Sequence, residues 1–187
     1  MPIKLLQEGD LWAAEVTPPQ GKWKSSRSMP IGSLVEELRS IGCRREDIDL
    51  ALRDTYLIKR EQDWNDQVLP KLRQAIAGTY EVPPQEPSEE GIIAYVLFER
   101  ESPLTLWEIS DAYDYLNRVG MTADALAWAF VRMNARGWLA EHGTLFGLTV
   151  DGRRTVMEIA GAGSIRDKMN RLVEWTQANP PTRDMRV

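Results

Sequence analysis

The stretch that decides the fold of the C-terminal half is Asn134-Ala-Arg-Gly-Trp-Leu-Ala-Glu-His-Gly-Thr-Leu-Phe-Gly-Leu-Thr149. Gly137 is a helix stop signal and predicts the end of a helix over residues 123–136. Two short segments, residues 138–141 and 145–149, lie on either side of His142-Gly143 and predict a tight β-hairpin. The stretch therefore predicts a helix that passes directly into two antiparallel strands.

Helical patterns surround this stretch on both sides. Upstream, apolar residues recur at helical spacing over residues 88–101 and 107–118, each with one buried face. Thr122 is the predicted N-cap of the helix at 123–136. Downstream, residues 152–160 and 164–177 are also predicted as helices, the second with a capping box between Ser164 and Asp167.

A short extended segment at residues 104–106 completes the order helix, strand, helix, helix and hairpin, which is the order of a winged helix-turn-helix domain. Residues 134–139 resemble the turn by which the third helix of that superfamily enters its first wing strand, commonly glycine, an aromatic and an aliphatic residue. Residues 146–154, Phe-Gly-Leu-Thr-Val-Asp-Gly-Arg-Arg, are similar to the second wing strand and the cap of the following helix. The resemblance covers residues 88 to about 160.

The resemblance implies a DNA-binding protein, with a transcriptional or other regulatory role. Winged helices most often place the third helix in the major groove of duplex DNA and a wing along the phosphate backbone. Basic and polar residues on these two elements would then contact DNA. The nucleic-acid-binding residues implied in this way are Arg118, Thr122, Arg132, Arg136, His142, Arg153 and Arg154.

The composition of the third helix supports an alternative function. With Leu126, Phe130 and Met133 turned toward the core, a helical wheel turns Trp128 and several small or apolar residues outward. Such a face offers few groups that pair with base edges, whereas an exposed tryptophan is typical of protein interfaces. The alternative is an assembly subunit that binds a protein partner without DNA, through a candidate interface of Trp128, Val131 and Ala135.

The helix at residues 164–177 carries an apolar stripe that has two interpretations. Added helices behind winged domains commonly form dimers in that superfamily, so the stripe predicts a homodimer contact. The same residues could equally pack on their own domain. The stripe consists of Ile165, Met169, Leu172 and Val173.

The N-terminal part begins with a predicted hairpin of residues 3–7 and 11–17 around Glu8-Gly-Asp10. Three helices are predicted to follow, and Pro70 would kink or divide the third. Their ranges are 31–42, 45–54 and 63–77.

Proline residues suggest the domain boundaries. Residues 79–87 contain Pro83, Pro84 and Pro87. Proline has no backbone N–H donor and favours extended conformations in the residue before it. We therefore predict an α+β protein in which a small hairpin-and-helix domain is joined by a Pro-rich linker to the winged-helix domain. The predicted segments are a domain of unknown role at 1–78, the linker at 79–87, the winged-helix domain at 88–178 and a tail at 179–187.

Two features of the N-terminal part have a functional and a structural interpretation. Residues 37–53 are similar to the first two helices of a ubiquitin-associated domain, although a simple helical hairpin would show the same spacing. A loop with three positive charges, an aromatic ring and no acid could hold phosphate or nucleic acid, or be an ordinary surface loop whose tryptophan folds back on the hairpin. Its candidate residues are Lys22, Trp23, Lys24 and Arg27.

Composition narrows the remaining classes of function. The 187 residues carry a formal charge of -5 and 43% hydrophobic residues, as in an ordinary globular protein. Cys43 and His142 are the only residues of their types, which excludes disulfide frameworks and Cys/His zinc sites. Enzyme, cofactor and metal motifs are missing, and the sequence has neither a membrane span nor a secretion signal. We expect a cytoplasmic protein that is not an enzyme and needs no cofactor.

Overall fold

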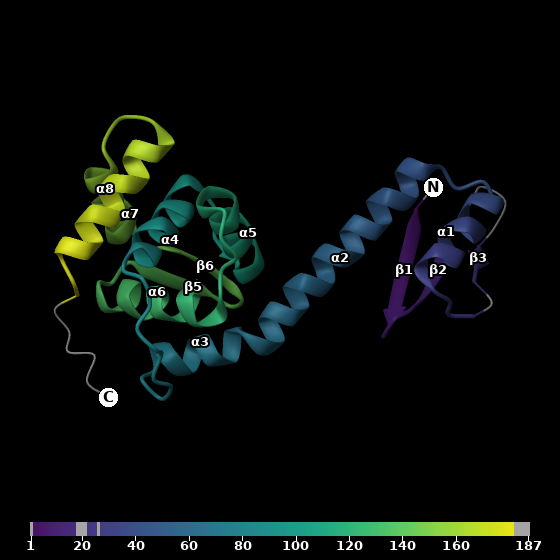
Figure 1. The fold of residues 1–187 in the computed structure, drawn as a ribbon, viewed down its shortest axis with the longest axis horizontal. Coiled ribbons are helices and arrows are strands. Elements are labelled where there is room, and N and C mark those ends of the chain that lie inside the picture. The colour runs from purple at the N-terminus through teal and green to yellow at the C-terminus, as the bar shows by residue number, and fades with distance from the viewer. Residues whose placement is uncertain (1, 18–21, 26, 182–187) are drawn as a thin grey trace. The chain divides into compact units, whose positions relative to one another are not determined.

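The computed structural model describes residues 2–17, 22–25 and 27–181 (Figure 1). It has the predicted α+β class, with helices and two small antiparallel sheets in the described part of the chain. Contacts divide the chain into two compact units, Met1–Arg60 and Glu61–Val187. In the described segments, no helix has both the length and the apolar character needed to cross a membrane.

The first unit contains the predicted hairpin. β1 (Ile3–Glu8) pairs with β2 (Leu11–Val16), and Gly9 in the turn has a φ of 60°, which glycine adopts without strain. β3 (Trp23–Lys24) pairs with the other edge of β2, and α1 (Ile31–Ser40) packs on this sheet. The core of the unit is formed by Leu5, Ala14, Val16, Leu34, Leu38, Cys43, Ile48 and Ala51. Cys43 is therefore a buried core residue of this unit.

The helices after α1 differ from the prediction in their lengths. α2 (Arg45–Gln67) continues past the predicted end at residue 54, because no glycine or proline interrupts the helix before Pro70. α3 (Leu69–Ile76) begins one residue before Pro70. Pro70 therefore lies in the first turn of the helix, where the backbone N–H groups have no partner within the helix, so the missing N–H of proline removes no hydrogen bond. The predicted helix at 63–77 is thus divided between α2 and α3.

The second unit has the element order predicted for residues 88–149. The short strand before the second helix, β4, pairs with β6 of the hairpin to give a sheet of order β4-β6-β5. The described elements are α4 (Ser88–Glu99), β4 (Leu104–Thr105), α5 (Leu106–Asn117), α6 (Ala123–Ala135), β5 (Leu139–His142), β6 (Leu145–Leu148), α7 (Val150–Ala160) and α8 (Ile165–Ala178). The predicted caps at Thr122 and Ser164 both form.

α4 lies at the centre of this unit, beside α8 (Figure 1). Every residue from Glu90 to Leu97 is buried, so the expectation of one buried face was wrong: α5, α6, α7 and α8 all contact the helix. Gly91 permits the closest approach, because a Cβ there would lie 2.7 Å from the backbone of Val173. The first turn of α4 is therefore enclosed by α8.

The Pro-rich segment at 79–87 does not separate the two units, which meet within α2 instead. α3 packs against α6, and Tyr80 and Val82 pack against the core of the second unit. The Tyr80 hydroxyl also donates a hydrogen bond of 3.2 Å to Asp124 Oδ1 on α6. Local proline composition predicted an extended segment, but the apolar side chains in it fasten the segment to the core.

Candidate functional site

The predicted outward face of α6 is largely buried. Trp128 is 6% exposed and Arg132 is 8% exposed, and all residues from Ala125 to Phe130 are buried. The wheel was wrong because it assumes a single core face, whereas both α3 and α4 pack on α6. Val131 and Ala135 are only half-buried, but Trp128 is not available as the exposed anchor of an interface.

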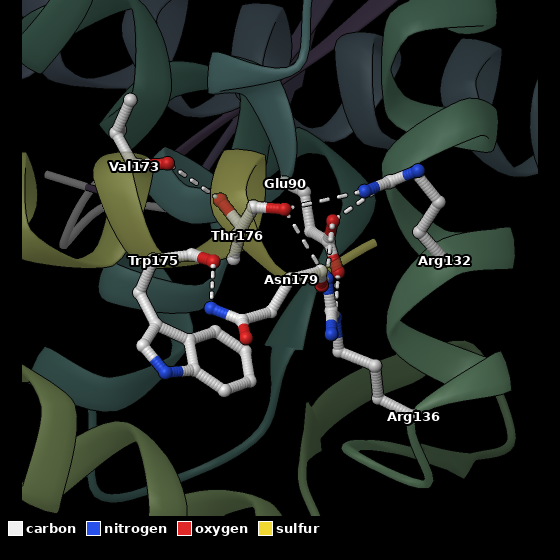
Figure 2. A network of polar contacts seen from close by, with 7 residues as sticks. All are labelled: Glu90, Arg132, Arg136, Val173, Trp175, Thr176 and Asn179. Carbon is white, nitrogen blue, oxygen red and sulfur yellow. Dashed lines mark hydrogen bonds and ion pairs between the residues drawn. The ribbon is translucent and has the colours of Figure 1, made fainter. Parts of the chain in front are cut away.

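Arg132 and Arg136 point to the carboxylate of Glu90 on α4 (Figure 2). Arg132 Nε donates to Glu90 Oε2 at 2.7 Å, while Arg136 donates to Oε1 through Nε and to Oε2 through Nη2 at 3.3 Å. The side chain of Glu90 is fully buried, and those of the two arginines are 10% and 7% exposed. One buried carboxylate therefore pairs with two guanidinium groups.

Both guanidinium groups also reach the C-terminal end of α8. Nη2 atoms of both Arg132 and Arg136 donate to the main-chain oxygen of Thr176 at 3.4 Å, and Arg136 also donates to that of Asn179. The last four carbonyls of a helix lack partners within the helix and carry the negative end of its dipole. The two arginines thus satisfy polar groups of both α4 and α8.

Aromatic rings cover the same guanidinium groups. The Arg132 guanidinium lies 4.6 Å from the ring centroid of Trp128, and that of Arg136 lies 5.1 Å from Trp138 and 5.0 Å from Trp175. Trp138 and Trp175 are stacked with centroids 5.5 Å apart. A desolvated cation over an indole face is a favourable contact. We call Glu90, Arg132, Arg136 and the end of α8 the arginine network; it joins three helices and leaves little guanidinium surface for phosphate.

Arg153 and Thr122 also have structural partners. Arg153 donates to main-chain oxygens of Phe98 at 2.8 Å and Leu97 at 3.1 Å, near the end of α4. Thr122 accepts a hydrogen bond from Ala125 N and so caps α6. Both side chains complete helix ends, which explains their presence without DNA.

Three of the predicted contacts remain at the surface. Arg154 is exposed and pairs with Asp151 at 2.7 Å, and His142 is exposed at the end of β5. Arg118 is exposed at the end of α5, where it adopts a left-handed φ of 55°. α5 therefore ends at Asn117, one residue before the predicted end at residue 118.

The hairpin of β5 and β6 is fastened to α3. Arg73 on α3 pairs with Glu141 at 2.7 Å and donates a hydrogen bond of 2.9 Å to the main-chain oxygen of Gly143. His142 lies between these two partners in the sequence. The turn that would serve as a wing is therefore bound to another helix of the same unit.

The basic residues predicted in the N-terminal loop are divided between a strand and the surface. Trp23 and Lys24 form β3, where Trp23 packs against the core and Lys24 pairs with Glu15 at 3.0 Å. The Lys24 ammonium lowers the pKa of Glu15, and Lys4 and Lys22 contribute to this shift. Lys22 and Arg27 are exposed. The carboxylate of Glu15 therefore neutralises part of the positive charge with which this segment would bind a phosphate.

A groove runs between α5 and the start of α8. Two adjoining hollows of about 650 and 590 Å³ form it, and both are lined by Leu116 and Ile165. We call it the α5–α8 groove. The larger hollow also contains Tyr115, which is 85% exposed, and Ile165 is 57% exposed.

The two halves of the α5–α8 groove carry opposite charge. Three acids, Glu99, Glu108 and Asp111, line the larger hollow together with one base, Arg100. Burial and the Glu99 carboxylate raise the pKa of Tyr95, which also lines this hollow.

The smaller hollow is lined by Arg118 and Arg166 and by no acid. Neither guanidinium group forms a hydrogen bond or ion pair with a described residue. Asn117 and Asn170 supply further polar groups at this end. The groove thus has an acidic end, an apolar middle and a basic end.

Sequence reasoning missed both the arginine network and the α5–α8 groove. Glu90 lies in the first turn of α4, and nothing in the local sequence indicates that two arginines some forty residues later are its partners. Glu108, Asp111, Tyr115 and Arg118 recur at spacings of three and four residues, which is a signal for one helix face. No protein-family model, curated protein or solved structure matches the chain.

Proposed function

We propose that residues 88–160 form a winged helix-turn-helix domain that binds a protein partner and does not read DNA. The order of helices and strands and the sheet order β4-β6-β5 support the winged-helix interpretation. The proposal adopts the assembly role that the sequence left as the alternative, but with a different surface. The α5–α8 groove replaces the face around Trp128.

The arginine network is the observation that carries this proposal. A third helix that reads DNA must present Arg, Lys, Asn or Gln side chains to base edges. Arg132 in α6 and Arg136 at its C-cap are instead held by Glu90, a fully buried carboxylate. Freeing them would leave a buried carboxylate without counter-charge, which costs several kcal/mol by the usual order of magnitude.

The packing of α3 supports the same conclusion. α3 covers part of α6, and Arg73 binds Glu141 and the turn at Gly143. Major-groove insertion of α6 would have to displace α3 together with its buried side chains Leu69, Leu72 and Ala75. The surface that most winged helices give to DNA is thus occupied by the chain itself.

The α5–α8 groove has the features of an interaction surface. Exposed apolar groups with a polar rim are typical of protein-binding sites, and tyrosine is enriched at the residues that dominate binding energy. Tyr115 and Ile165 are the exposed apolar residues that line it. The charged residues at either end supply the rim.

We expect micromolar protein to produce no shift of labelled duplex DNA of random sequence, even at low salt. At low salt, binding through phosphates is strongest, so this is the most permissive condition for any non-specific affinity. An electrophoretic titration from low to physiological salt measures the effect. A shift that weakens steeply with salt and is reduced in Arg132→Ala, compared with Arg154→Ala as the exposed control, would overturn the proposed function.

A further inference from the structure

We propose that the partner of the α5–α8 groove is a second copy of this chain, bound through the same groove in a two-fold symmetric dimer. The inference rests on the proposed function and names the partner for that surface. A two-fold interface uses one patch on both subunits, so the patch must be complementary to itself. The charge and the spacing of residues on α5 meet that requirement.

The exposed face of α5 carries acids near its start and a base at its end. Glu108, Asp111, Tyr115 and Arg118 are all exposed, and their spacings of three, four and three residues place them along one stripe. Asp111 and Arg118 lie seven residues apart, about 10 Å along a helix with a rise of 1.5 Å per residue. Tyr115 lies between them.

An antiparallel pair of these helices matches opposite charges. When a two-fold axis passes near Tyr115, Asp111 of each copy lies opposite Arg118 of the other copy. The same rotation turns the start of α5, with Glu108, toward the end of α5 in the other copy, where Arg118 lines the basic hollow. Because the side chains of Asp111, Arg118 and Arg166 form no hydrogen bond or ion pair among the described residues, they can make such contacts.

The apolar middle of the groove supplies the burial that such a dimer needs. Tyr115 and Ile165 are 85% and 57% exposed, and Leu116 lies at the junction of the two hollows. Near the two-fold axis, these side chains would contact the same residues of the other copy. An apolar centre surrounded by charged groups is the usual anatomy of a protein interface.

Charge reversal tests the pairing of Asp111 with Arg118. Asp111→Arg alone places two arginines opposite each other at both ends of the dimer, and Arg118→Glu alone places acids opposite acids. Each variant is expected to weaken self-association at least about tenfold, because like charges across an interface disfavour the complex. Mixed together, the two variants restore both opposite-charge contacts and should form a heterodimer.

Sedimentation velocity of the full chain, with one variant carrying a fluorophore, measures both effects. Arg154→Glu reverses a charge that does not line the groove and is expected to leave self-association unchanged. Circular dichroism checks that each variant is folded. A wild-type chain that stays monomeric at high micromolar concentration would overturn the second copy as partner, and so would two variants that fail to associate when mixed.

These outcomes are separable from failure of the proposed function. A monomeric chain that also leaves duplex DNA unshifted loses the second copy as partner but keeps the binding role of the groove. Salt-sensitive DNA binding that depends on Arg132 overturns the proposed function whether or not the chain forms dimers.

Discussion

Glu90→Gln is expected to lower the free energy of unfolding of the second unit by about 3 to 5 kcal/mol, the usual cost of removing one partner from a buried ion pair. The substitution keeps the shape of the side chain but removes its charge. Arg132 and Arg136 would then remain buried as cations with only carbonyl groups as partners. The large effect follows from the charge left behind, not from a lost contact.

Urea unfolding followed by tryptophan fluorescence and circular dichroism measures this loss. Glu101→Gln is the matched control, since Glu101 is exposed and a surface change of this kind usually alters stability by less than about 0.5 kcal/mol. The double variant Glu90→Gln with Arg132→Gln should be less destabilised than the two single changes added together, because it removes one stranded charge. A loss for Glu90→Gln no larger than that of the control contradicts the network.

Trp128→Ala is the second change with a large expected effect. Truncating a buried tryptophan costs about 3 to 5 kcal/mol, since the cavity adds to the lost transfer free energy. We expect the lower end of that range, because Trp128 packs on the Arg132 guanidinium and not within the main apolar cluster. Loss of the ring also removes a cation–π contact from the network.

Thermal and urea unfolding at low protein concentration measure the effect of Trp128→Ala. Tyr115→Ala truncates an aromatic residue on α5 that is 85% exposed, so it should leave the stability of the single chain nearly unchanged. An unaltered melting temperature for Trp128→Ala would mean that the indole lies at the surface. That result would restore the outward face predicted from the helical wheel.

Local patterns predicted the elements of the second unit because their signals lie close together in the sequence. The capping box of Ser164 with Asp167, the cap at Thr122 and the turn after Gly137 each depend on residues within a few positions. The hairpin and the helix order could be predicted for the same reason. Strand and helix ends differ from the prediction by one or two residues in this region.

The burial of Trp128 and Arg132 could not be predicted from the helical wheel, because a wheel assumes one core face. α6 is covered by α3, which precedes it by about fifty residues, and its arginines meet the end of α8. Such contacts depend on topology, which the spacing within α6 does not encode. An arginine in an amphipathic pattern predicts exposure unless a buried acid elsewhere can be identified as its partner.

The Pro-rich segment shows a related limit. Prolines at residues 83, 84 and 87 correctly excluded a helix there, but they carry no information about what Tyr80 and Val82 contact. The unit boundary falls inside α2, where helical signals continue without interruption. Composition alone could not locate a boundary inside a continuous helix.

The central claim, that Arg132 and Arg136 hold the unit together instead of facing DNA, can be tested directly by arginine modification. Brief treatment of the dilute native protein with phenylglyoxal, followed by peptide mass spectrometry, reports the reactivity of each side chain. We predict rapid modification of the exposed Arg118, Arg154 and Arg166, with Arg132 and Arg136 protected until urea unfolds the chain. Native reactivity of Arg132 and Arg136 equal to that of Arg118 would contradict the account.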